Sequence, residues 1–123
     1  MAKKQNKPLL RSWIKSLRSG VRKQTRDTLH RRYADAELPA GYCCLGDLSV
    51  VIGGKKTIAG WRWNGEAWKN KKQKDFNDWT IPDAVLEALN LHIDQERLTR
   101  FNDKGHWGFP RIANWLEKKY LKA

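Results

Sequence analysis

The sequence is organised around a short apolar block, residues 42–48, that separates two strongly basic segments. The first basic segment, residues 1–32, carries eleven Lys or Arg and one Asp, and the second, residues 55–74, carries seven and one Glu. The block itself has the composition of a packed interior. Its adjacent Cys43 and Cys44 lie too close along the chain for an unstrained disulfide, so we expect two reduced, buried thiols.

The composition predicts one folded domain with an anionic partner. A chain of 123 residues is long enough for a single core, and its seven Trp supply core volume that the sparse Ile and Val do not. A net charge of +12 and a pI near 10.0 favour polyanionic ligands. We expect residues 1–7 to form a flexible basic N-terminus and residues 8–123 to form the domain.

A basic amphipathic helix is predicted over residues 8–19. Pro8 suits its first turn, and Gly20 suits the left-handed position that ends it. Leu9, Leu10, Trp13, Ile14 and Leu17 share one face, and Arg11, Lys15 and Arg18 share the other. The basic face is either a solvated surface or a surface that contacts a ligand.

Residues 21–32 have no apolar period and hold five cations, Arg22, Lys23, Arg26, Arg31 and Arg32. We expect a loop or a short helix held out to solvent, where phosphate groups dock. A helix is then predicted over residues 42–52, with Cys43, Cys44, Leu48 and Val51 on one face and Gly53-Gly54 as the terminator. Gly46 marks a close approach of another segment.

A β-hairpin is predicted from residues 58–63, a tight Asn64-Gly65 turn and residues 66–69. Alternation places Trp61 and Trp63 on one face and Arg62 on the other. Two interpretations remain open for the aromatic side chains of this hairpin. They form a surface that stacks bases beside neighbouring cations, or they cover the core. The second basic segment supplies these candidate ligand-binding residues: Lys55, Lys56, Trp61, Arg62, Trp63, Trp68, Lys71 and Lys72.

The C-terminal half is predicted to be helical. One helix opens at Pro82 and Asp83 and closes at Asn90, and a second begins after Asp94 and runs to about Phe101. The last helix begins at Pro110 and carries an apolar stripe. The expected fold class is therefore α+β, a single small domain of about four helices packed with one Trp-rich β-hairpin.

Three sequence blocks resemble a family of small, uncharacterised bacteriophage and prophage proteins. The blocks are Trp13-Ile14-Lys15-Ser16-Leu17-Arg18-Ser19-Gly20 with Gln24, then Tyr42-Cys43-Cys44-Leu45-Gly46, and finally Asn102-Asp103-Lys104-Gly105 with Phe109-Pro110-Arg111-Ile112-Ala113. The resemblance implies a phage origin and a single domain, and it brings no established activity. The chain departs from the family pattern at Asp47-Leu48-Ser49 and in its more basic N-terminal segment.

The sequence favours the cytoplasm of a bacterial host cell. It contains no apolar run of the ~18 residues that a membrane span needs, and its N-terminus lacks the pattern of a secretory signal. Two unpaired thiols suit a reducing compartment. We therefore expect no membrane partner.

Catalysis and metal binding are not expected. The candidate metal ligands lack zinc-site spacing; they are Cys43, Cys44, His30, His92 and His106. A buried thiol with His106 as base lacks a group that would lower the thiol pKa. Gly53-Gly54-Lys55-Lys56 is too short for a phosphate loop, so no cofactor is predicted.

The predicted function is non-catalytic binding of a phosphate-bearing anion by a phage-encoded accessory protein. The ligand is a nucleic acid or a nucleotide signal of host defence, contacted through the basic segments and the Trp residues. The alternative is a counter-defence or host-takeover inhibitor, or a virion assembly factor, that docks on an acidic surface of a host or phage protein. The oligomeric state stays open.

Overall fold

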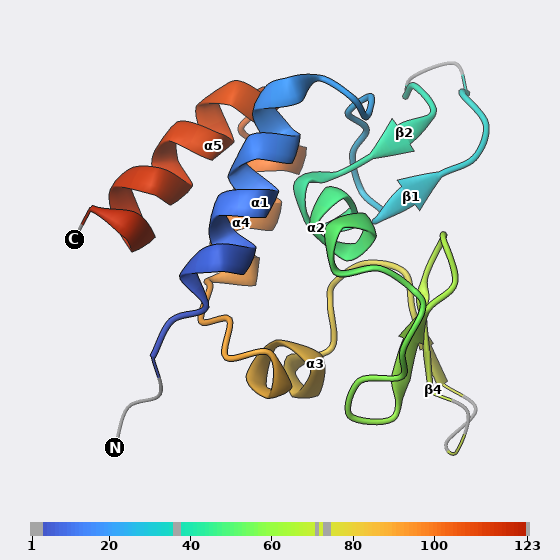
Figure 1. The fold of residues 1–123 in the computed structure, drawn as a ribbon. Helices are drawn as coiled ribbons and strands as arrows, with labels where there is room; N and C mark the ends of the chain where they lie inside the picture. The colour runs from blue at the N-terminus through green and yellow to red at the C-terminus, as the bar shows by residue number, and fades with distance from the viewer. Residues whose placement is uncertain (1–3, 36–37, 71, 73–74, 123) are drawn as a thin grey trace.

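A computed structural model describes residues 4–35, 38–70, 72 and 75–122, and it confirms a small α+β domain (Figure 1). The described elements, in chain order, are α1 (Lys7–Ser19), β1 (His30–Arg31), β2 (Gly41–Tyr42), α2 (Cys44–Ile52), β3 (Trp61–Trp63), β4 (Trp68–Asn70), β5 (Asp75–Asn77), α3 (Asp83–Ala88), α4 (Gln95–Asp103), α5 (Phe109–Leu116) and the π-helical turn η1 (Glu117–Leu121). Helix α1 packs against both α2 and α5, and the three-stranded sheet β3-β4-β5 lies on the far side of α2 from α5.

Helix α1 forms as the sequence predicts. The Asn6 side chain accepts a hydrogen bond from the Leu9 amide, and Pro8 occupies the first turn. Gly20 ends the helix with φ of 71°, a left-handed conformation that an L side chain rarely adopts. The buried side chains of the helix are those of the predicted apolar face, and Leu9 is only partly buried.

The N-terminal residues that precede α1 are tied to the connection between α3 and α4. The Gln5 side chain donates to the His92 carbonyl at 2.6 Å and accepts from the His92 amide at 2.7 Å. The Asn6 amide group donates to the Leu89 carbonyl at 2.8 Å. Within the N-terminus that is predicted to be flexible, residues 5 and 6 thus make specific contacts, and residues 1–3 lie outside the described part.

Helix α2 begins two residues later than predicted. Tyr42 belongs to strand β2, where it pairs with His30, and Cys43 is the N-cap, whose thiol accepts from the Gly46 amide. The predicted close approach at Gly46 is confirmed, because a Cβ atom there would lie 1.8 Å from the Leu29 carbonyl oxygen. Val51, predicted to share the buried face, is partly exposed instead.

The predicted hairpin is one part of a three-stranded antiparallel sheet. Trp63 pairs with Trp68, so four residues connect β3 to β4 where a two-residue turn is predicted. The Asn64 side-chain oxygen accepts from the amides of Glu66 and Ala67, and these bonds favour the longer turn. Strand β5 is not predicted, because its three residues include a single apolar side chain, Phe76.

The C-terminal helices follow their predicted caps. The Asp94 carboxylate accepts from the Arg97 amide at the start of α4, which continues two residues past the predicted Phe101. Asn90 closes the α3 turn with a positive φ of 55°. Helix α5 begins at Phe109, one residue before the prediction. None of the helices in the described part of the chain combines the length and apolar character that crossing a bilayer requires.

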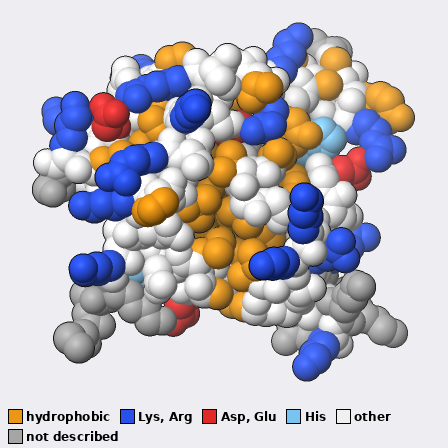
Figure 2. Space-filling model, in the orientation of Figure 1, with side chains coloured by type: hydrophobic (Ala, Val, Ile, Leu, Met, Phe, Trp, Pro, Cys, Tyr) orange, Lys and Arg blue, Asp and Glu red, His pale blue; other side chains and the backbone are white. Residues whose placement is uncertain are grey.

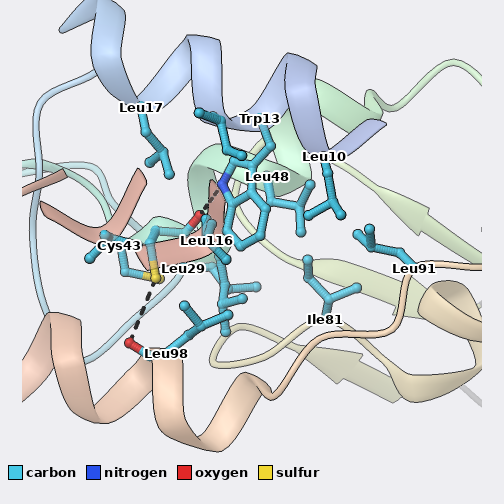
Figure 3. Packing of buried hydrophobic residues seen from close by; sticks show 14 of the residues in the cluster. Leu10, Trp13, Leu17, Leu29, Cys43, Leu48, Ile81, Leu91, Leu98 and Leu116 are labelled. Carbon is cyan, nitrogen blue, oxygen red and sulfur yellow. Dashed lines mark hydrogen bonds between the residues drawn. The ribbon is translucent and has the colours of Figure 1, made fainter. Parts of the chain in front are cut away.

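One hydrophobic cluster joins these elements (Figure 3). Trp13 from α1 is fully buried, and its indole N–H donates to the Cys44 carbonyl at 3.0 Å. Trp68 from β4 is fully buried too, and its indole N–H donates to the Ser49 hydroxyl at 2.9 Å. Both large rings therefore bury their area without losing the hydrogen bond that an indole requires.

We expect Gly46→Ala to destabilise the fold by about 3 kcal/mol or more, because its methyl group overlaps the Leu29 carbonyl. Gly20→Ala is the control: nothing lies within 4 Å of an added Cβ there, and only the left-handed backbone opposes it, at about 1 kcal/mol. Urea unfolding followed by Trp fluorescence measures both. Equal losses would contradict the close approach.

Candidate nucleic-acid interface

The basic face of α1 keeps two exposed cations without ion pairs in the described part of the chain, Arg11 and Lys15. The third predicted cation, Arg18, lies beside α5. Its guanidinium contacts the Glu117 carboxylate at 3.2 Å and the Asn114 side-chain oxygen at 2.9 Å. The salt bridges lower the pKa of Glu117, so this carboxylate stays ionised.

Arg22 pairs with a buried carboxylate, which argues against its prediction as a phosphate contact. Its Nε donates to the Asp47 carboxylate at 2.7 Å, and Asp47 is fully buried. The Ser16 hydroxyl donates to the same carboxylate oxygen at 3.0 Å. Burial raises the pKa of Asp47, while Arg22 and Ser16 oppose that rise. An isolated buried carboxylate is costly, so Arg22 is committed to this partner.

The other cations of residues 21–32 are also mostly engaged. Arg31 pairs with Asp35 at 3.1 Å, Arg32 pairs with Glu66 at 2.5 Å, and the Arg26 guanidinium contacts the His106 ring. Lys23 is exposed. The segment is not held out to solvent as predicted, because buried Leu29 and strand β1 anchor it to the domain.

The prediction that Trp63 and Trp68 stack exposed bases is wrong. Trp63 is 5% exposed and Trp68 is 0% exposed, and their ring centroids lie 5.8 Å apart on the core side of the sheet. Trp61 faces the same side and is partly buried. Of the two interpretations left open by the sequence, the one in which the Trp face covers the core is confirmed, since the short sheet needs one buried face.

The opposite face of the sheet carries a cross-strand row of exposed side chains. Arg62 pairs with Lys69, and Lys69 pairs with Phe76, so one residue from each strand lies in line. Neighbouring side chains in such a row lie roughly 4.5–5.5 Å apart at Cβ. Phe76 is 66% exposed, although a large ring gains free energy from burial. We call this row, together with Lys72, the sheet face.

A hollow of about 470 Å³ lies beside this row. Arg62, Lys69 and Lys72 line it, together with residues 57, 59, 60 and 70. The Arg62 Nε donates to the Gly54 carbonyl at 2.6 Å, which fixes the guanidinium at the edge of the hollow. None of the three cations makes an ion pair with a described residue. The sheet face therefore offers uncompensated charge to an anion.

The remaining candidates of the second basic segment lie elsewhere. Lys55 and Lys56 follow α2 and are exposed at the rim of a second hollow, between α1 and α2. Lys71 lies outside the described residues. Sequence reasoning missed Phe76, and the available signal was an apolar residue between two polar ones, in a short segment after a lysine run.

The thiols show no sign of nucleophilic activation. Burial raises the pKa of Cys43 to about 12 and raises that of Cys44 as well. The Cys44 thiol donates to the Leu98 carbonyl inside the core. Among the described residues, no group of three or more His, Cys, Asp or Glu is placed to hold a metal ion. The geometry thus assigns the thiols to packing.

We expect Arg22→Met to cost about 3 kcal/mol at neutral pH, because it leaves a buried carboxylate without its cation. Burial already raises the pKa of Asp47, and removing Arg22 raises it further. The folded variant then binds a proton that the unfolded chain releases, so its stability falls as the pH rises above about 4. Urea unfolding at acidic and neutral pH measures the difference.

The matched control for that variant is Arg18→Met, which removes a cation from the more exposed Glu117. We expect it to cost less than about 1 kcal/mol. An Arg22→Met deficit no larger than that of the control, or one unchanged by pH, would contradict the buried pair.

Iodoacetamide should modify neither Cys43 nor Cys44 in the folded protein, because both thiols are buried and their pKa values are raised. Both should react after unfolding in urea. Mass spectrometry counts the adducts. Rapid labelling of one thiol in the folded protein would show an accessible thiolate and reopen the question of catalysis.

Comparison with protein-family models, with curated proteins and with solved structures gives no match to this chain. The resemblance to phage proteins therefore stays a prediction. The sheet face is one surface on which described, unpaired cations and an exposed aromatic ring occur together.

Proposed function

We propose that this protein binds single-stranded nucleic acid on the sheet face, without catalysis, as a phage accessory protein in the bacterial cytoplasm. The observation that supports the proposal is the row formed by Arg62, Lys69 and Phe76. Cations that follow a phosphate backbone and rings that stack on bases are the two components of sequence-tolerant single-strand binding. A sheet with cations and an aromatic ring on its solvent face uses the same two interactions as the sheet surfaces that bind unpaired RNA bases.

The layout favours a strand over a duplex. Phe76 is 66% exposed and stands on the sheet surface, so a base must leave its own stack to cover the ring. Unpaired bases are free to do so, whereas bases in a duplex are already stacked and paired. Lys69 and Arg62 continue the row away from the ring, and with Lys72 they line the hollow, where successive phosphates would pass.

The layout also favours a strand over a single nucleotide. A nucleotide site closes several groups around one ligand and buries most of its surface. Here the three cations line one hollow, but Phe76 is not among its lining residues, so the ring and the cations do not close around one ligand. A strand can place a base on the ring and its phosphates along the hollow. A different surface, described below, is better suited to a protein partner.

Phe76→Ala should weaken binding of a fluorescein-labelled single strand by about 1–3 kcal/mol, the free energy of one stacked base. Fluorescence anisotropy measures the affinity. Tyr33→Ala is the matched control, because Tyr33 is 75% exposed and lies outside the sheet face. We expect the control to bind as the unaltered protein does, and equal losses in both variants would contradict stacking on Phe76.

The same titration at several salt concentrations tests the cations. Lys69→Glu with Lys72→Glu should lower the salt slope by about 0.7 for each lost phosphate contact. Arg11→Glu with Lys15→Glu changes the net charge equally but lies on α1, so it should leave most of the affinity intact. The opposite ranking of the two variants would move the site to the first basic segment and overturn the proposal.

A further inference from the structure

A second hollow, of about 680 Å³, lies between the start of α1, the end of α2 and the loop that follows α2. Its floor is aliphatic: Leu9, Val51, Ile52, Ile58 and Leu89 line it, and each is partly exposed. Figure 2 shows hydrophobic side chains gathered between α1 and the hairpin strands on this face, with Lys and Arg at the borders. We call this hollow the aliphatic groove.

Lys55 and Lys56 form the charged rim of the aliphatic groove. Both are exposed, and neither makes an ion pair with a described residue. None of the described residues that line the groove is acidic. An occupant that complements it must combine apolar groups with negative charge.

Val51 is the part of the floor that does not pack against the core cluster. The other four aliphatic residues pack partly against the core cluster, whereas Val51 does not belong to it. Val51 belongs to the last turn of a short helix, where a polar residue would be tolerated equally well. The exposed part of this aliphatic side chain gains free energy when a ligand covers it.

The end of α2 favours a peptide over a fatty-acid anion. The Gly53 amide donates to the Ser49 carbonyl, so the carbonyls of residues 50–52 lie beyond the last hydrogen bond of the helix. Two of these residues line the groove. A peptide brings N–H donors for such carbonyls, together with apolar side chains and carboxylates, whereas a fatty acid has no donors.

We propose that the aliphatic groove binds a short, acidic, amphipathic segment of another protein. Apolar side chains of the segment cover Val51 and Ile58, and its carboxylates face Lys55 and Lys56. This peptide site goes beyond the proposed nucleic-acid function and uses none of the sheet-face residues. Each of the two proposals therefore holds if the other fails.

Selection from a displayed library of random short peptides on the full chain tests the proposal. Enriched peptides should combine at least two aliphatic or aromatic residues with Asp or Glu. Val51→Gln should weaken their binding roughly tenfold or more, the equivalent of one uncovered aliphatic side chain. The stability and nucleic-acid affinity of this variant should be unchanged, which separates its effect from unfolding and from the sheet face.

Charge is tested in the same assay. Lys55→Glu with Lys56→Glu should abolish binding of the acidic peptides, and Arg11→Glu with Lys15→Glu, an equal change of net charge on α1, should not. A selection with no enrichment, peptides without acidic residues, or binding that survives Val51→Gln would overturn the proposal. Binding of laurate in place of the peptides, lost in the same variants, would replace it with a lipid-anion site.

Discussion

The side-chain amide of Asn102 joins three parts of the chain that the rest of the fold depends on. It is 1% exposed, accepts from the Cys44 amide at 3.2 Å and from the Gln24 side chain at 2.8 Å, and donates to the Thr25 carbonyl at 2.9 Å. A fourth bond, at 2.8 Å, reaches Asp103. All four hydrogen-bonding positions of the amide are therefore used, and any replacement leaves buried polar groups unpaired.

This network brings three separate sequence blocks together in space. Gln24, Cys44 and Asn102 each come from a different block, and they meet in one buried cluster. Gln24 also accepts from the Phe109 amide, which positions the start of α5. These residues are committed to holding backbone groups. Such residues form the scaffold, and a ligand site must be sought on the surfaces that they support.

Local order was predictable from the sequence, and pairing at a distance was not. Helix α1 follows from apolar spacing and a glycine stop, and the start of α4 follows from the Asp94 cap. Nothing local indicates that Arg22 meets Asp47, or that Arg18 meets Glu117 across 99 positions. The sheet face was not predictable from the sequence, because it depends on the pairing of β5 with β4. The three residues of β5 are too few to show an alternating pattern.

Ion pairing removes some of the cations that this chain could offer to a ligand. In the first basic segment, Asp47 and Asp35 pair two of the eleven cations, and Glu117 pairs a third. The second basic segment keeps its cations unpaired at Arg62, Lys69 and Lys72. Such crowding costs folding free energy, and an anionic partner relieves that repulsion when it binds. The loop of residues 53–60 contributes residues to both hollows. An anion bound in one hollow would therefore lower the positive electrostatic potential that an anion meets in the other.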